Sequence, residues 1–348
     1  MRSEKNFSPI PHSSFLIILF CCVISPNLFF SASCKQEPSR AEFVLGTVCS
    51  VTLFNQAHKS VYRDIFKRLR EIENLMSVNI AGSDIARINA SSGIEPVLVH
   101  EEVFKVIERA VYFADESGGA FNPAVGPLVS LWGIGTEKPR VPSQAEIDEV
   151  LPLLNWRDIE LDPSGSVFLR NRGMALDLGA IAKGYAADEV SAIIKNAKIN
   201  RAIIDLGGNI VVCGEKKDKS PWKVGIQNPI EKRGVFIGIV SAKELSVVTS
   251  GVYERFFEKD GVRYHHIFLP SSGYPAENEL LSVTIISRNS IDADALSTAA
   301  FVLGYERGKS LIESTPETEA VFIFKDRSVR KTTGADFTLT DRTFSLYD

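Results

Sequence analysis

The sequence predicts a globular protein that combines helices and strands. Short runs of branched apolar residues, such as residues 283–286, indicate buried strands. Longer segments with apolar residues three and four positions apart, such as residues 60–76 and 101–116, indicate amphipathic helices. The 348 residues are 45% hydrophobic and 24% charged, which is typical of globular proteins, and this length suits one large or two ordinary domains.

The charge of the chain argues against a nucleic acid partner. The formal net charge is -4, and the Lys and Arg residues are scattered along the sequence rather than clustered. Proteins that bind nucleic acid usually carry a basic patch. We therefore expect no nucleic acid partner.

Residues 1–33 have the features of a secretion signal. Arg2 and Lys5 give a positive start, residues 15–24 form an apolar core too short to span a membrane comfortably, and small residues lead to Cys34. This order resembles a bacterial lipoprotein signal peptide, with Cys34 as the lipid-modified first residue of the mature chain.

An ordinary cleaved secretion signal is the alternative, because Pro26 interrupts the apolar run and Ser31 stands where lipoprotein signals usually carry Leu. Under the lipoprotein interpretation, residues 34–41 are a polar tether and residues 42–348 are the folded domain. The lipid would then anchor the protein to the inner membrane of a bacterium, on the periplasmic side.

The mature chain opens with a predicted strand over residues 42–54, which Gly46 and Thr47 interrupt. Once the signal is removed, Cys49 and Cys213 are the candidates for a disulfide. Neither lies in a spacing typical of metal sites, so both are predicted to be core thiols.

Two helices follow this strand. The first covers residues 60–76, and the second covers residues 101–116 and ends near Gly118, a common signal for a helix C-terminus. Residues 78–89 between them form a polar connection that carries Asn79. Binding residues often lie in loops of this kind.

Residues 119–128 are predicted to be packed but irregular. Their glycines and prolines disfavour regular helix, and their apolar residues disfavour free solvent. Further along, Ser143 and Glu146 have the spacing of a capping box at the start of a short helix. Residues 156–169 then indicate two strands joined by a tight turn.

A second informative stretch covers residues 175–188. Apolar residues lead to Asp177, and small residues around Lys183 let a ligand or another segment approach the backbone before a helix that continues to about Lys195. Backbone amides at such a helix start, together with Lys183, would attract a diphosphate. A Gly- and Ala-rich packing junction is the alternative, since the stretch matches neither a Walker nor a Rossmann motif.

Two of the five His residues, His265 and His266, lie side by side after a predicted hairpin turn at Asp260. In an extended strand they face opposite ways, so at most one points into a given site. A single His on a strand is more often structural than catalytic. The strands that precede this hairpin are predicted at residues 201–205, 222–227, 235–241 and 245–249.

The chain is organised around a strand at residues 283–286 that leads into a helix at residues 293–303. Asp294 and Thr298 are four residues apart, so a carboxylate and a hydroxyl share one face of the first turn. Such a sparse oxygen pair suits a Mg²⁺ ion that is shared with a nucleotide. The alternative is an exposed N-cap followed by a Thr that bonds back to a backbone carbonyl.

Four motifs together resemble the ApbE family, the FAD:protein FMN transferases. They are Leu45-Gly46-Thr47, residues 119–128, residues 177–188, and the run from Thr249-Ser250-Gly251 through Tyr264-His265-His266 and Ser272-Gly273-Tyr274-Pro275 to Asp294 and Thr298. The resemblance covers nearly all of the mature chain. It implies an α+β fold class, with mixed sheets packed with helices in a T-fold-related single domain and the flavin site between its two halves.

The resemblance also implies a reaction. Members of this family cleave the diphosphate of FAD with Mg²⁺, release AMP, and pass FMN to a Thr hydroxyl of a partner protein. The acceptor Thr lies in a motif resembling Asp-Gly-x-Thr-Gly-Ala-Thr, as in subunits of membrane redox pumps.

Site residues follow from the same resemblance. Asp294, Thr298 and the backbone carbonyl of Ala180 would hold Mg²⁺, and His266 would be the base for the acceptor hydroxyl, with a neutral imidazole near its normal pKa. The residues expected to contact FAD are Leu45, Asn79, Ala120, Phe121, Asn122, Asp177, Lys183 and the backbone near Phe268.

Two residues depart from the family pattern. Leu269 replaces an Asp that usually precedes the Pro of the His266 segment, and Asn79 occupies a place where many relatives carry Tyr or another aromatic residue. Two alternatives therefore stay open beside the transferase. One is a Mg²⁺-dependent FAD pyrophosphatase that releases FMN and AMP, and the other is a flavin-binding lipoprotein without catalytic activity.

Overall fold

The computed structural model describes residues 39–54 and 59–347. The predicted signal peptide, the proposed lipidation residue Cys34 and the first part of the predicted tether lie outside these residues. No helix in the described part is both long enough and apolar enough to cross a membrane.

A large mixed sheet organises the described part of the chain. All neighbouring strands in it are antiparallel except the last two, which are parallel. In order across the sheet, the strands are β1 (Ser39–Val44), β2 (Thr47–Leu53), β6 (Ala202–Leu206), β7 (Asn209–Cys213), β10 (Leu245–Gly251), β15 (Leu280–Ser287), β16 (Thr318–Phe324), β17 (Ser328–Lys331) and β19 (Ser345–Tyr347).

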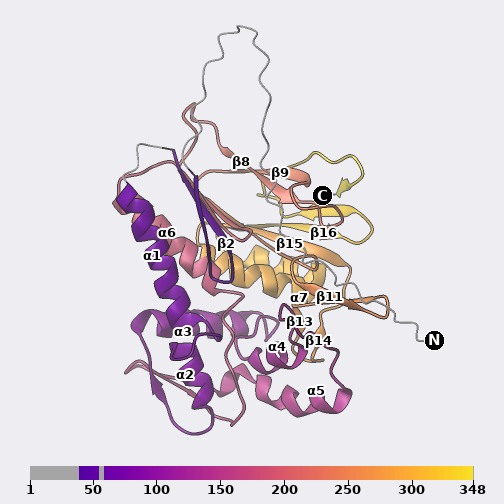
Figure 1. Ribbon diagram of the computed structural model, residues 1–348. Helices are drawn as coiled ribbons and strands as arrows, with labels where there is room; N and C mark the ends of the chain where they lie inside the picture. Colours follow the sequence, from indigo (N-terminus) through magenta and orange to yellow (C-terminus); the bar gives the residue numbers. More distant parts are fainter. Residues whose placement is uncertain (1–38, 55–58, 348) are drawn as a thin grey trace, which may run out of the picture. The chain divides into compact units, whose positions relative to one another are not determined.

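Both faces of this sheet are covered. Helices α1 (Lys59–Met76), α6 (Ala182–Asn196) and α7 (Ser290–Ser314) pack on one face, and a small sheet packs on the other (Figure 1). In β7, Val211 belongs to the helix-side core and its neighbour Val212 to the opposite core, because successive side chains of a strand point to opposite faces. The small sheet consists of β8 (Trp222–Gln227), β9 (Phe236–Ala242) and β18 (Phe337–Leu339).

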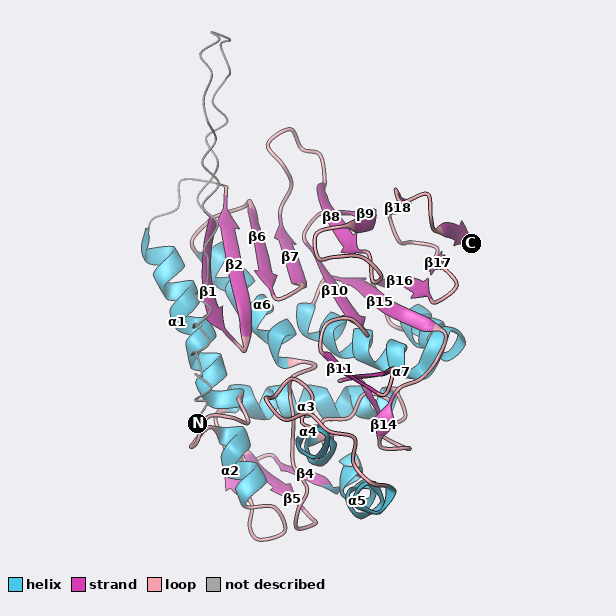
Figure 2. Ribbon diagram, turned by 45° about the vertical axis from the view of Figure 1, so that its right-hand side comes forward, coloured by secondary structure: helices cyan, strands magenta, loops and turns pink. Residues whose placement is uncertain are grey.

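The remaining helices lie together on the side of α7 that faces away from the large sheet, and α3 packs against α7 (Figure 2). They are α2 (Asp84–Ala90), α3 (Glu101–Glu116), α4 (Gly126–Trp132), α5 (Gln144–Val150) and the 3₁₀ helices η1 (Leu151–Leu154) and η2 (Trp156–Asp158). A small sheet of β3 (Val97–Leu98), β4 (Ile159–Asp162) and β5 (Ser166–Leu169) accompanies them, and two hairpins pair β11 (Phe256–Lys259) with β12 (Val262–His265) and β13 (Phe268–Leu269) with β14 (Tyr274–Pro275).

Two segments differ from the sequence-based prediction. The polar connection at residues 78–89 contains α2, because the hydroxyl of Ser83 accepts a first-turn amide at 3.0 Å and caps the helix. Residues 119–128 are irregular only in their first part. Helix α4 begins at Gly126, and Pro127 is tolerated because the first turn of a helix leaves its amides without helical partners.

Other local predictions are confirmed. The helices at residues 60–76 and 101–116 are α1 and α3, and Ser143 and Glu146 form a complete capping box.

Strand β1 begins at Ser39, three residues before the predicted start of the first strand at residue 42. Residues 39–41 were expected to end the tether, but they pair with β2.

Cys49 and Cys213 are free thiols, as predicted. Burial raises the pKa of Cys49 to about 12 and that of Cys213 to about 11. A thiol with such a raised pKa is a poor nucleophile and a poor metal ligand, so these cysteines serve packing.

Candidate functional site

The predicted diphosphate loop and the predicted metal pair meet where α6 and α7 begin. The backbone amide of Gly184 donates to Asp294 Oδ2 over 2.9 Å. A side chain would not fit at Gly184, because a Cβ there would lie 2.3 Å from the carbonyl oxygen of Ser290. The small residues of the loop therefore form a close packing junction, and this junction brings Lys183 next to Asp294.

Lys183 lies between the loop and α7. Its ammonium group donates to the Gly179 carbonyl at 3.0 Å and is 3.7 Å from Asp294 Oδ1. Asp177 orders the other end of the loop, since its Oδ1 accepts the amide of Gly179 at 2.8 Å. The start of α6 thus offers a positive charge to an anionic ligand, and one Asp294 oxygen already faces a cation.

Thr298 completes the predicted metal pair. It follows Asp294 by about one helical turn, and its hydroxyl is 3.2 Å from Ser250 Oγ of β10. Ala180, partly exposed, lies in the same loop as Lys183. Carboxylate, hydroxyl and carbonyl oxygens are hard donors that suit Mg²⁺.

These donors alone do not make a closed metal cage. Within residues 39–54 and 59–347, no group of three or more His, Cys, Asp or Glu side chains is placed to hold a metal ion. The donor set therefore fits an ion that takes its other ligands from water and a substrate phosphate.

Asp294 is not a helix cap. Asn289 is the N-cap of α7, and Asp188 of α6 accepts the first amides of the helix, those of Ser290 and Ile291, at 2.9 Å each. The interpretation of Asp294 as an exposed cap is therefore wrong: its residue is only 5% exposed and lies in the second turn.

A cavity of about 480 Å³ reaches α7 at Val302, further along the helix than the predicted metal pair, which does not line it. Val302 lines it, and Asp294, Thr298 and Val302 recur at every fourth residue, so they share one face of α7. A ligand that extends along this face from Asp294 would reach the cavity about two helical turns further on. Other lining residues include Ala120, Asn122, Leu154, Trp156, Leu269 and Arg307.

The segment from Ala120 to Asn122 divides between this cavity and the core. Ala120 and Asn122 line the cavity, but Phe121 is buried and does not. The Asn122 amide donates to the Leu154 carbonyl at 2.7 Å and accepts the Ala124 amide at 2.8 Å. Asn122 therefore shapes the loop, and the contact between Phe121 and FAD stays a prediction, which with its side chain in the core would be made by the backbone.

Leu45 and Asn79 lie near the C-terminal end of α1. Leu45 is in the turn between β1 and β2, and the next amide, that of Gly46, donates to Glu73 of α1 at 3.3 Å. Asn79 is exposed, and its backbone N–H donates to Ser77 Oγ at 3.2 Å. The structure thus brings the two predicted flavin contacts to one end of α1, although neither lines the cavity next to Val302.

His266 lies just after β12 and is held by Arg255. Its Nδ1 is 3.1 Å from the Arg255 carbonyl oxygen. A carbonyl can only accept, so Nδ1 carries the proton and the neutral ring keeps its lone pair on Nε2. Burial lowers the pKa of His266 to about 4, and the charges of Arg255 and Lys183 contribute in the same direction. The expectation of a near-normal pKa is therefore wrong, but the ring is neutral at pH 7.

His265 has a structural role. It is buried, its Nε2 donates to the Ala276 carbonyl at 3.1 Å, and its Nδ1 accepts the Ile267 amide at 3.3 Å. Both ring nitrogens are thereby used within the protein. Phe268 is likewise buried, with its ring 5.9 Å from that of Trp132, so only its backbone and the adjoining Leu269 are available to the site.

Acid is expected to destabilise the fold through these histidines. Burial lowers the pKa of His265, like that of His266, from 6.5 to about 4, so folding favours the neutral rings. Their contribution to stability is complete above about pH 6.5 and is lost as the pH falls toward 4. Asp188 acts in the opposite direction, because burial raises its pKa to about 6, but two histidines outweigh one carboxyl.

Thermal melts followed by circular dichroism test this expectation. The melting temperature should fall between about pH 6.5 and about pH 4.5, and the fall should be smaller in His266→Asn, which lacks one titrating ring. A melting temperature that stays constant or rises on acidification would contradict it.

The fold and these side chains define an α+β protein with a polar site where α6 and α7 meet the large sheet. The ApbE family model matches residues 45–322 of the chain. A Treponema pallidum protein named FAD:protein FMN transferase is 42% identical over 336 residues, which cover 91% of this chain and 92% of the relative. A Klebsiella pneumoniae protein of the same name is 42% identical over 266 residues, covering 76% and 82%.

Solved structures agree. The ApbE protein of Thermotoga maritima superimposes with a TM-score of 0.77 at 34% identity, covering 88% of this chain and 98% of that one. The flavin transferase ApbE of Vibrio cholerae gives 0.76 at 27% identity, covering 89% and 98%. The chain belongs to the ApbE family, and both the resemblance and the α+β prediction are confirmed.

Proposed function

We propose that this protein is an FAD:protein FMN transferase, which moves FMN from FAD to a hydroxyl group of an acceptor protein and releases AMP. The names of its relatives support this activity. The observation that carries it in this chain is the junction of α6 and α7, where Lys183 lies 3.7 Å from Asp294 and one helix face leads from Asp294 to the cavity.

The residues divide the work as follows. Lys183 and the loop backbone bind the diphosphate, and the cavity next to Val302 takes one ring system of FAD. Asp294, Thr298 and the Ala180 carbonyl would hold Mg²⁺. When bound, the ion offsets negative charge on the diphosphate and on the leaving AMP.

His266 is the proposed general base for the acceptor hydroxyl. Its Nδ1 is fixed to the Arg255 carbonyl, so Nε2 accepts the proton of the acceptor hydroxyl. The hydroxyl oxygen then forms a bond to the phosphorus that carries FMN, and the bond between this phosphorus and the bridging oxygen breaks. AMP leaves with that oxygen.

The experiment is to incubate the purified protein with FAD and Mg²⁺, with and without an acceptor peptide, and to follow AMP. The peptide contains the sequence Asp-Gly-x-Thr-Gly-Ala-Thr, which we propose as the acceptor motif by resemblance. AMP release that the peptide accelerates, with FMN attached to the peptide, supports the transferase. AMP release at the same rate with and without the peptide supports a pyrophosphatase. If no AMP appears in either case, the protein is a flavin-binding protein without catalytic activity.

FAD hydrolysis is a second candidate activity, because Asn79 is a small exposed residue at a position where the family resemblance leads us to expect an aromatic ring. An aromatic ring stacked on a flavin or adenine adds on the order of 1 kcal/mol and excludes water. We expect measurable Mg²⁺-dependent AMP release from FAD alone, and slower release in Asn79→Tyr, which should also retain FAD through purification. The hydrolysis proposal is contradicted if wild type releases no AMP from FAD alone, or if Asn79→Tyr releases AMP as fast as wild type does.

We propose further that Cys34 carries a lipid that anchors the protein to the inner membrane on the periplasmic side. The proposal rests on the order of charged, apolar and small residues before Cys34. The mass of the mature N-terminal peptide tests it, since an unmodified peptide that begins after an ordinary cleavage site would rule out the lipid.

A further inference from the structure

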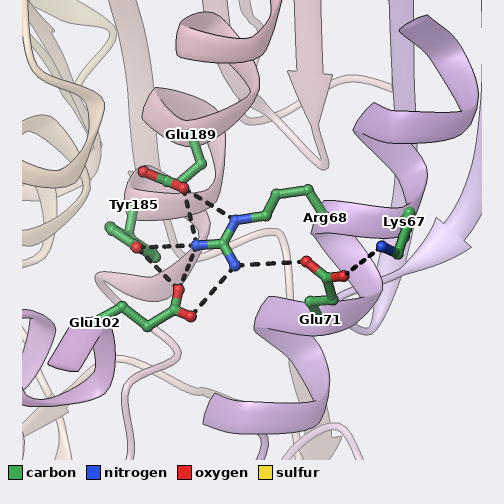
Figure 3. A network of polar contacts seen from close by, with 6 residues as sticks. All are labelled: Lys67, Arg68, Glu71, Glu102, Tyr185 and Glu189. Carbon is green, nitrogen blue, oxygen red and sulfur yellow. Dashed lines mark hydrogen bonds and ion pairs between the residues drawn. The ribbon is translucent and has the colours of Figure 1, made fainter. Parts of the chain in front are cut away.

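One arginine, Arg68, links the three helices α1, α3 and α6 on the side of α6 that faces away from α7. Arg68 of α1 contacts Glu102 of α3 and both Tyr185 and Glu189 of α6 (Figure 3). Its Nε is 3.0 Å from Glu189 Oε2, its Nη1 is 3.3 Å from Glu102 Oε1, and its Nη2 is 3.2 Å from Tyr185 Oη. Tyr185 also donates its hydroxyl proton to Glu102 at 3.0 Å. A single planar guanidinium thus holds all three partners in fixed directions.

This network is partly shielded from water. The side chains of Arg68 and Glu102 are 20% and 24% exposed, and that of Glu189 is 35% exposed. Glu71 lies 3.7 Å from Arg68 on the same helix and is also paired with Lys67. Without the guanidinium, two negative charges, Glu102 and Glu189, would face each other in a partly buried space with no cation between them, so α6 would move away from α3.

The same two turns of α6 hold the functional site on their other side. Gly184 and Asp188, four residues apart, contact α7 through the Asp294 carboxylate and the first amides of that helix. Tyr185 and Glu189, each one residue later, contact Arg68. The start of α6 is therefore fixed from two sides, by α7 and by Arg68, and Lys183 lies in this first turn.

We propose that Arg68 is a positioning residue. Through Tyr185 and Glu189 it fixes the first turn of α6, and it thereby sets the place of Lys183 and Gly184 relative to Asp294. Arg68 touches no proposed ligand, so its effect on the reaction passes through α6. The inference rests on the proposed function, because the position of Asp294 matters to catalysis only if Mg²⁺ and the diphosphate bind there.

Two variants test the role. Arg68→Met removes the charge and keeps the aliphatic stem, and Tyr185→Phe removes a single hydroxyl. In the protein without ligands, the amides of residues 182–186 should exchange hydrogen faster than in wild type, by about tenfold in Arg68→Met. The Mg²⁺ concentration that gives half-maximal FAD binding should rise about tenfold in Arg68→Met and about threefold in Tyr185→Phe.

A matched control lies on the same helix. Arg70 pairs with Glu42, and its side chain is 50% exposed, so Arg70→Met makes the same chemical change at an exposed ion pair. This variant should leave both measurements unchanged. Arg68→Lys keeps the charge but cannot bridge three partners, so it should fall between wild type and Arg68→Met.

The inference is overturned if folded Arg68→Met and Tyr185→Phe show only a lower melting temperature, with the exchange and the Mg²⁺ response of wild type. If Arg68→Met does not fold, Tyr185→Phe decides alone. Failure of the proposed function is distinct, because it appears in wild type as a lack of FAD cleavage. An active wild type with unchanged variants refutes only the positioning role.

Discussion

Asp294→Asn is expected to lower FMN transfer by about 1000-fold or more while the protein stays folded. The Asn carbonyl oxygen still accepts the Gly184 amide, which keeps the junction of α6 and α7. The negative charge that would hold Mg²⁺ is lost, and a loss of about 4 kcal/mol of transition-state stabilisation corresponds to this factor. AMP release at saturating FAD, together with circular dichroism, measures both parts.

Asp292→Asn is the matched control for this variant. Asp292 lies in the first turn of the same helix, but both of its oxygens pair with Arg109 at 2.8 Å. Its replacement should affect stability more than catalysis. Asp294→Ala is a poorer test, because the buried Gly184 amide would lose its acceptor at a cost of roughly 1–3 kcal/mol. A folded Asp294→Asn protein that turns over normally at ordinary Mg²⁺ would refute the metal assignment.

His266→Asn is expected to reduce transfer by about 100-fold or more and to leave FAD binding nearly unchanged. The Asn amide can still donate to the Arg255 carbonyl, but no group then accepts the hydroxyl proton at the place of Nε2. Single-turnover transfer to the acceptor peptide and titration of flavin fluorescence separate the two effects. Equal losses of binding and transfer would make His266 a ligand contact or a structural residue.

Substitution of the neighbouring His265 serves as the comparison for His266→Asn. This substitution should be costly, since His265 is buried with both ring nitrogens bonded and its ring packs edge-on against Phe301. His265→Gln should lower the melting temperature. The folded protein should keep its transfer rate, in contrast to His266→Asn.

The sequence predicted those features that depend on local patterns. The apolar periodicity of α1 and α3 and the capping box at Ser143 involve residues within a few positions of one another, so they can be recognised before the fold is known. The spacing of Asp294 and Thr298 also predicted that they share a helix face. Helix α2 was missed because it has only seven residues, and its signals are a single cap at Ser83 and two apolar residues, Ile85 and Ile88, at helical spacing.

Features that depend on distant residues could not be predicted in this way. Asp294 is buried because Gly184, 110 positions earlier, packs against α7, and no local pattern distinguishes such a carboxylate from an exposed cap. The lowered pKa of His266 likewise follows from tertiary burial. Ser250, which lies beside Thr298, was part of a recognised motif, but its contact arises only when β10 meets α7.

The most direct test of the proposed function is the mass of an acceptor peptide after incubation with the protein, FAD and Mg²⁺. We predict that the peptide gains the mass of an FMN phosphoester on its Thr, that AMP appears in at least an equal amount, and that neither occurs with Asp294→Asn. A peptide of unchanged mass, with FMN and AMP accumulating free in solution, would contradict the transferase and leave the protein as an FAD pyrophosphatase.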